Sequence, residues 1–242
     1  MLRTVALGAV LLGGPVLADG DPRITFLARQ LGTATDPRVR AQAALTLGTT
    51  EAPEALAPLC TALADPVPLV RAAVARSLPE LHDLAALDCL GAHGADPAPE
   101  AQGEIRRAIA LLRKVRERPP TVDVWVDPVQ DPSRPPLGET LCGEARIRLV
   151  KRLAWSGARS EGVESASKRV RGTPAYLLQP TLLRGDGGAL VLAAVCLTWP
   201  SKQILGEVRV KGSGGTPLDL IRVLVPRLIQ DAASTFEWEL TP

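Results

Sequence analysis

The sequence predicts an α+β protein of two domains, in which a short α-solenoid precedes a small α/β sandwich with a mostly antiparallel sheet and helices on one face. Three observations lead to this prediction. Asp-Pro recurs at Asp36, Asp65 and Asp96, 29 and 31 residues apart, and a near-constant period of this size is typical of a solenoid. Alternation of apolar and polar residues, which is typical of strands, begins only after residue 121. All four tryptophans, the tyrosine and one of the two phenylalanines also lie beyond that point.

Length and composition limit the class of protein. The 242 residues are 46% hydrophobic and 22% charged, which suits one or two globular cores. The net charge is +2 and neither half is strongly charged, so no overall field would recruit nucleic acid or an anionic membrane. We expect a signal peptide over 1–18, a helical repeat domain over 19–115, a linker over 116–121 and an α+β domain over 122–242.

The first stretch, MLRTVALGAVLLGGPVLA, is typical of a secretory signal peptide. Arg3 gives the positive start, Val5–Leu12 is the apolar stretch, and Val16 and Ala18 occupy the −3 and −1 positions of a cleavage site. The apolar stretch is shorter than the ~20 residues that span a bilayer, and no cysteine stands at the cleavage point to carry a lipid. We therefore expect cleavage after Ala18 and a periplasmic or secreted protein with no membrane insertion after cleavage.

Each repeat is expected to open with a helix. Asp caps the helix and Pro takes its first turn, where a missing N–H costs nothing. Apolar residues then follow at helical spacing and form one stripe in each copy. The stripes are Val39, Ala43, Ala44 and Leu47 in the first copy, and Val70, Ala73, Val74 and Leu78 in the second. A helix pair cannot bury its apolar face alone, so the copies should stack.

A second, leucine-rich helix is expected in each copy, over 52–63 and over 78–94. Their apolar faces are Leu56, Leu59 and Leu63, then Leu84, Leu87 and Leu90. Residues 21–32 predict an entry helix, and residues 96–115 predict an exit helix that lacks the Val-Arg step of the earlier copies, as a terminal repeat can.

The stretches DPRVRAQAALTLG and DPVPLVRAAVARSL resemble the first helix of HEAT repeats, with the Asp-Pro opening, Val-Arg, then Ala-Ala and Leu. The resemblance covers about residues 20–115. It implies that Arg40 and Arg71 bond to the aspartate of a neighbouring repeat. The expected ladder along the stack consists of Asp36, Arg40, Asp65, Arg71 and Asp96. Some HEAT-like proteins are chromophore lyases, so the resemblance leaves an enzyme or lyase as an alternative.

The second half predicts the order strand, helix, three strands, helix. Val122, Val124 and Val126 alternate with polar residues and Trp125, as in a strand with one wet face. A helical stripe follows over 137–153. Three strand-like runs over 175–183, 189–199 and 203–210 are joined as hairpins, and residues 216–233 predict a closing helix. Pro180 in the first of these runs favours a sheet edge or a bulge.

This order of elements, with the VDVWVDP start and the GTPAYLLQPTL entry to the hairpins, resembles a periplasmic domain found in three groups of proteins. They are the amino-terminal part of the TolB translocation protein, curli-secretion lipoproteins and outer-membrane activators of penicillin-binding proteins. The resemblance covers about residues 120–235 and implies an alternative role as the activator of a cell-wall synthase. The activators are lipoproteins, whereas this chain has no lipid-bearing cysteine.

Four cysteines suit an oxidising compartment. Cys196 lies in an apolar strand that should pack under the helix of Cys142, so we favour a Cys142–Cys196 disulfide over Cys60–Cys89, because Cys89 lies off the leucine face of its helix. Four cysteines allow three pairings, and buried free thiols remain an alternative.

Catalytic chemistry finds little support in the sequence. The two histidines, His82 and His93, lie on polar stretches of the helical half, so no Ser-His-Asp set is expected beside the sheet. No cluster has metal-ligand spacing. The glycines of KGSGGTPLDL lack the phosphate-loop pattern and predict a loop that leads to an N-cap at Thr216. We expect no catalytic residue, no metal and no cofactor.

Two features favour partner binding. Arg146, Arg148, Lys151 and Arg152 crowd one helix, either as a solvated face or as a site for an anionic partner such as a cell-wall polymer. Trp125 shares a strand face with two aspartates, so it either packs under the helical half or a loop, or binds a partner.

The most specific function that the sequence predicts is an exported, non-enzymatic adaptor or scaffold of the cell envelope. It would bind protein partners through the solenoid and through the α+β domain, and would bind no nucleic acid. The identity of the partner and the oligomeric state stay open.

Overall fold

The computed structural model describes residues 21–162 and 172–240. The expected signal peptide and its cleavage after Ala18 lie outside the described residues. The first half is helical, with a 3-10 turn η1 (Pro53–Ala55) before its third helix. Its helices are α1 (Pro22–Thr33), α2 (Pro37–Gly48), α3 (Leu56–Ala62), α4 (Pro68–Glu80), α5 (Ala86–His93) and α6 (Pro99–Arg116).

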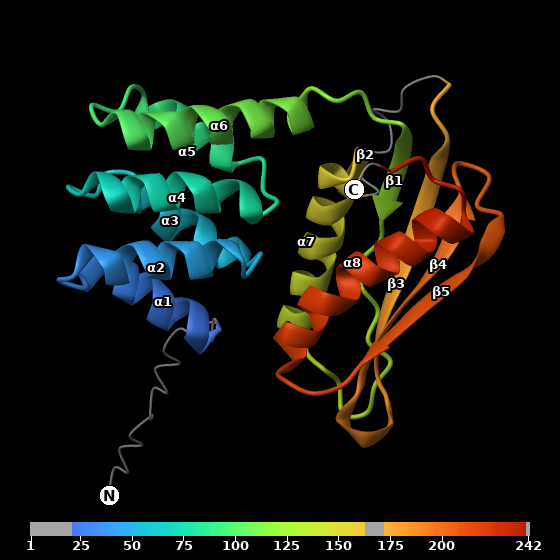
Figure 1. Ribbon diagram of the computed structural model, residues 1–242. Coiled ribbons are helices and arrows are strands. Elements are labelled where there is room, and N and C mark those ends of the chain that lie inside the picture. Colours follow the sequence, from blue (N-terminus) through green and yellow to red (C-terminus); the bar gives the residue numbers. More distant parts are fainter. Residues whose placement is uncertain (1–20, 163–171, 241–242) are drawn as a thin grey trace, which may run out of the picture.

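The helices stack in two layers, α1, α3 and α5 in one and α2, α4 and α6 in the other (Figure 1). Asp36 caps α2 through the Arg38 N–H, and Pro37 takes the first turn. In the next two repeats the aspartate bonds to the N–H two residues on, and the helix begins later, at Pro68 and Pro99. A second proline therefore sets the start of these helices.

The core of the solenoid is built from alanine and branched aliphatic residues. Ala44, Leu47, Val70 and Val74 are fully buried. Val39, which was expected in the same stripe, is 41% exposed. Its repeat equivalent Val70 lies on α4, which packs between α2 and α6, whereas no helix of the described residues precedes α2 in its layer.

The second half contains one five-stranded sheet with the order β2-β1-β3-β4-β5. The strands are β1 (Val122–Val126), β2 (Ala158–Gly162), β3 (Ala175–Arg184), β4 (Leu190–Thr198) and β5 (Ile204–Gly212). β1 pairs in parallel with β2 and β3, and the other two pairings are antiparallel. Most residue pairs of the sheet are antiparallel, as expected, and the parallel pairs involve β1, because the helix after β1 returns the chain to a parallel strand.

Helices α7 (Glu139–Trp155) and α8 (Pro217–Thr235) cover one face of this sheet, as expected. α7 lies over β1 and β2, and α8 lies over β4 and β5. A short 3-10 turn, η3 (Asp186–Gly188), closes the hairpin of β3 and β4, and a capping box of Thr216 and Asp219 begins α8. None of the helices in the described ranges is long and apolar enough to cross a membrane.

Pro180 lies in a central strand whose pairing with β4 is regular, not at the expected sheet edge or bulge. β3 runs between β1 and β4, and Pro180 pairs with Ala194. Its pairing with β1 has already ended at Leu178. The Pro180 carbonyl accepts a hydrogen bond from the Gln130 N–H. Because the regular pairing with β1 has ended on this side of the strand, the N–H that proline lacks is not needed for the sheet there.

Candidate functional site

Two bidentate ion pairs connect the repeats. Arg40 donates from Nε to Asp65 Oδ2 at 2.7 Å and from Nη2 to Oδ1 at 3.0 Å. One repeat on, Arg71 bonds to Asp96 in the same way at 2.6 and 2.8 Å. Arg40 Nη1 also donates to the carbonyl of Ala34, and Arg71 Nη1 to that of Asp65. Each arginine therefore ties the turn before its own helix to the turn of the next repeat.

The Arg71–Asp96 pair is the more deeply buried, since the Asp96 side chain is fully covered. The hydrogen bonds from Arg71 hold the pKa of Asp96 well below its usual range. Burial alone would raise the pKa of Asp65, but the hydrogen bond from Arg40 lowers it. Asp36 stands at the open end of the series, where its side chain accepts from the backbone of Arg38.

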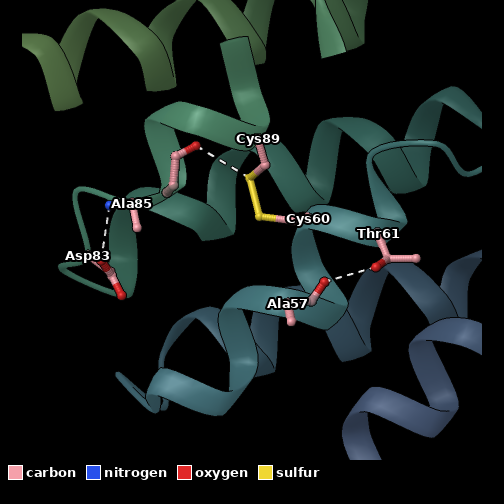
Figure 2. The surroundings of a disulfide bond; sticks show 7 residues. Ala57, Cys60, Thr61, Asp83, Ala85 and Cys89 are labelled. Atoms are coloured by element: carbon pink, nitrogen blue, oxygen red, sulfur yellow. Dashed lines mark hydrogen bonds between the residues drawn. A yellow bond between two sulfur atoms is a disulfide. The ribbon is translucent and has the colours of Figure 1, made fainter. Parts of the chain in front are cut away.

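A disulfide joins Cys60 of α3 to Cys89 of α5, with Cα atoms 5.6 Å apart (Figure 2). This separation is within the usual range for a bridge. It links successive helices of the layer formed by α1, α3 and α5, so the bridge and the arginine pairs fasten the two layers separately.

The preference for a Cys142–Cys196 bridge was wrong, since both of these thiols are free. Cys142 lies on α7, above β1 and β2, whereas Cys196 lies in β4 beneath α8. Burial raises the pKa of Cys196 to about 12. The position of Cys89 off the leucine face does not disfavour a Cys60–Cys89 bridge, so this expectation was also wrong. A bridge between stacked helices needs cysteines on the flanks that face each other, not on the leucine faces.

Three of the four basic residues of α7 contact the solenoid, and α7 runs beside the stack of helices (Figure 1). Arg148 is buried and donates to Glu144 on its own helix at 2.6 Å and to the Glu51 carbonyl at 2.8 Å. Lys151 pairs with Asp83, and Arg152 Nη1 lies 3.1 Å from His82 Nδ1. Arg146 donates to the Val126 carbonyl at the end of β1. These four residues therefore do not form an open site for an external anion.

Two equivalent residues of successive repeats, Glu51 and His82, lie at the contact between the solenoid and α7. Glu51 follows α2 and His82 follows α4, 31 residues later, and both have a positive φ, of 50° and 53°. Their side chains lie 3.3 Å apart, between His82 Nδ1 and Glu51 Oε1. Burial alone would raise the pKa of Glu51, but the hydrogen bond from His82 lowers it. Trp155 at the end of α7 packs on the His82 ring and on the solenoid core.

Trp125 is fully buried, so it offers no surface to a partner. It lies on the face of the sheet opposite α7 and α8, in a small cluster with Leu177 and Leu197. Its apolar companions in this cluster all come from the sheet domain and not from the helical half.

No catalytic constellation was expected from the two histidines. His93 lies beside the buried Asp96 of the ladder at 3.1 Å, and His82 belongs to the contact with α7. Across residues 21–162 and 172–240, no group of three or more His, Cys, Asp and Glu side chains is placed to hold a metal ion.

Comparison with known families identifies the repeated half. Residues 24–111 match the family model of HEAT repeats. HEAT repeats commonly mediate protein interactions, so this match suggests a protein-interaction scaffold in general terms. Searches of curated proteins and of solved structures found no match.

The contact with α7 decides which surface of the scaffold is free. α7 lies against the turns that follow α2 and α4. The outer surface of α2, α4 and α6 keeps exposed apolar side chains, including Leu69 on α4 and Leu111 on α6. A groove between α4 and α6 is lined by Ala75, Pro79, Ala108 and Leu111, with Arg76, Glu80, Glu104 and Arg107 at its sides. This surface is the candidate binding site.

Proposed function

We propose that the chain is an exported, non-enzymatic adaptor of the cell envelope that binds a protein partner on the solenoid. The match of residues 24–111 to HEAT repeats carries the proposal. The contacts between the α7 cations and the solenoid also support it. These contacts hold the second domain against the turns at one edge of the solenoid, so the outer surfaces of the helical layers stay open to a partner. The signal-like start of the chain supports export.

A photo-crosslinking residue at Leu69 or Leu111 tests the binding role. Both positions are about half exposed and lie on the solenoid. We expect each to capture the same envelope protein in cells, identified by mass spectrometry. A probe at Leu205 on β5, which is equally exposed, reports whether the α+β domain makes a second contact. The adaptor proposal would be overturned if neither the Leu69 probe nor the Leu111 probe captured a protein.

The mass of the mature protein tests export. We expect intact-mass measurement of protein from the envelope fraction to show a chain that begins at Asp19. A full-length chain that stays in the cytoplasm would refute the proposed location. Reproducible turnover of a small molecule by the purified chain would instead favour an enzyme, and copurification with a transpeptidase would favour a synthase activator.

A further inference from the structure

The last helix of the solenoid, α6, carries one continuous basic stripe on its outer side. Its members recur every three or four residues along the helix, and two of these positions are adjacent pairs of basic residues. They are Gly103, Arg106, Arg107, Ala110, Arg113, Lys114 and Glu117. All of these are exposed except Gly103, which is half-buried. We call this set the α6 stripe. α6 lies at one end of the stack, with α4 on its other side (Figure 1).

The α6 stripe occupies the position at which a further repeat would stack. Repeat equivalents in α4 and α6 are 31 residues apart, so Arg106 corresponds to Ala75, which is fully buried beneath α6. Gln102 corresponds to Arg71 and accepts a hydrogen bond from the Asp96 N–H of its own repeat, which leaves no arginine to reach onward. The repeat series therefore ends at α6, and its outer side is a surface of the protein.

The charge of the α6 stripe is largely uncompensated. Glu104 beside it is shared by Arg76 at 3.0 Å and Arg107 at 2.8 Å. Arg106, Arg113 and Lys114 form no ion pair with any residue that the structure describes. Cations in the last turn of a helix interact favourably with the helix dipole. This interaction explains the positions of Arg113 and Lys114. Arg106 lies in the middle of α6, where the dipole gives no such benefit.

The shape of the α6 stripe suits a helix more than a flat surface. Gly103 and Ala110 lie two turns apart on its midline, and a Cβ atom added to Gly103 would meet nothing within 4 Å. Small residues on a midline let another helix approach closely, while the long cationic side chains stand on both sides. Leu111, 46% exposed, borders the stripe and adds apolar contact.

We propose that the α6 stripe docks an acidic helical segment of the protein partner, with its Glu or Asp side chains against Arg106, Arg113 and Lys114. This inference rests on the proposed adaptor function and names the chemistry of the partner. The apolar edge at Leu111 and the small midline favour a protein helix over an anionic membrane surface, since a membrane needs no narrow midline.

The experiment measures binding of the chain from residue 19 to 242 to a three-heptad helical peptide of Ala, Leu and Glu by fluorescence anisotropy. The control peptide carries Gln in place of Glu. We expect the Arg106→Glu/Arg113→Glu variant to bind about tenfold more weakly than the parent, and Arg106→Lys/Arg113→Lys to bind nearly as well. Binding of the parent should weaken with added salt, because salt screens exposed charges. The matched control is Arg29→Glu/Arg38→Glu, which reverses two exposed arginines on α1 and α2.

The outcomes separate this inference from the adaptor proposal. Equal loss in the matched control, or equal binding of the Gln peptide, would overturn docking at the α6 stripe. So would binding to anionic phosphatidylglycerol vesicles but not to the Glu peptide. If crosslinking at Leu69 still captures the envelope partner from the Arg106→Glu/Arg113→Glu variant in full yield, the stripe is excluded and the adaptor proposal stands. Loss of capture in that variant alone would support the stripe, and absence of capture in the parent would remove both.

Discussion

Gly48 of α2 lies against Ser77 of α4 so closely that a Cβ atom at Gly48 would stand 2.8 Å from the Ser77 Cβ and carbonyl oxygen. Two of the neighbouring atoms belong to the backbone, so the contact cannot be relieved by rotation of a side chain. We predict that Gly48→Ala lowers the free energy of unfolding by about 1–2 kcal/mol, because overpacking outweighs the better helix propensity of alanine. Chemical denaturation measures the change.

Gly143 of α7 provides the matched control for Gly48. It also lies inside a helix, and a Cβ atom there would meet nothing within 4 Å. Gly143→Ala should raise stability by about 1 kcal/mol. If both substitutions stabilise the protein, the close packing of α2 on α4 is not a constraint.

Arg71 is expected to be the most important polar residue of the solenoid. Arg71→Ala would leave the buried Asp96 carboxylate without its main partner, which costs about 3 kcal/mol in comparable buried pairs. Arg71→Lys should recover part of this loss, since lysine keeps the charge but lacks the planar fork. Thermal unfolding of the full mature chain measures both, and an unchanged melt for Arg71→Ala would contradict a structural role.

The same ion pair predicts a loss of stability in acid. Hydrogen bonds from Arg71 lower the pKa of Asp96 in the folded state, while an unfolded aspartate titrates near about 3.9. The folded state therefore binds fewer protons, so this contribution is present above about pH 4 and is lost as the pH falls below that value. Denaturation midpoints from neutral pH downward should fall more steeply for the parent than for Arg71→Ala. Parallel curves would contradict the prediction.

Thiol counting tests the cysteine assignment. In denaturant without reductant we expect two reactive thiols, from Cys142 and Cys196, and four after reduction. Cys60→Ser/Cys89→Ser should lose about 3 kcal/mol, since the bridge closes a loop across 29 residues. Four reactive thiols before reduction would refute the bridge.

The contact of α7 with the solenoid is expected to protect the linker. Arg148→Met removes the bond to the Glu51 carbonyl and leaves the buried Glu144 unpaired, so we predict faster protease cleavage between residues 116 and 122. Arg209→Met, which breaks an exposed pair with Glu207, should leave the rate unchanged. Equal rates for both variants would show that this contact does not hold the halves together.

Features that depend on the repeat spacing could be predicted from the sequence, whereas contacts that depend on which side of a helix faces a neighbour could not. The spacing of Asp36, Asp65 and Asp96 gave the stack, because each repeat carries its own start signal. β2 was not predicted from the sequence because its residues, ARSEG, include no β-branched residue. The Cys60–Cys89 bridge and the inward use of Arg148 depend on which side of a helix meets a neighbour from a distant part of the chain. A single sequence does not specify that before the layers are known.

α7 joins two successive repeats of the solenoid to the sheet domain. Its 17 residues make a helix about 25 Å long, which is long enough to meet two successive repeats whose helices lie about 8–10 Å apart. In Figure 1 the helix runs alongside the stack. Its cations contact the turns after α2 and α4 and so hold these two repeats against the sheet domain. An insertion between these two repeats would therefore separate contacts that a single helix now makes to both of them.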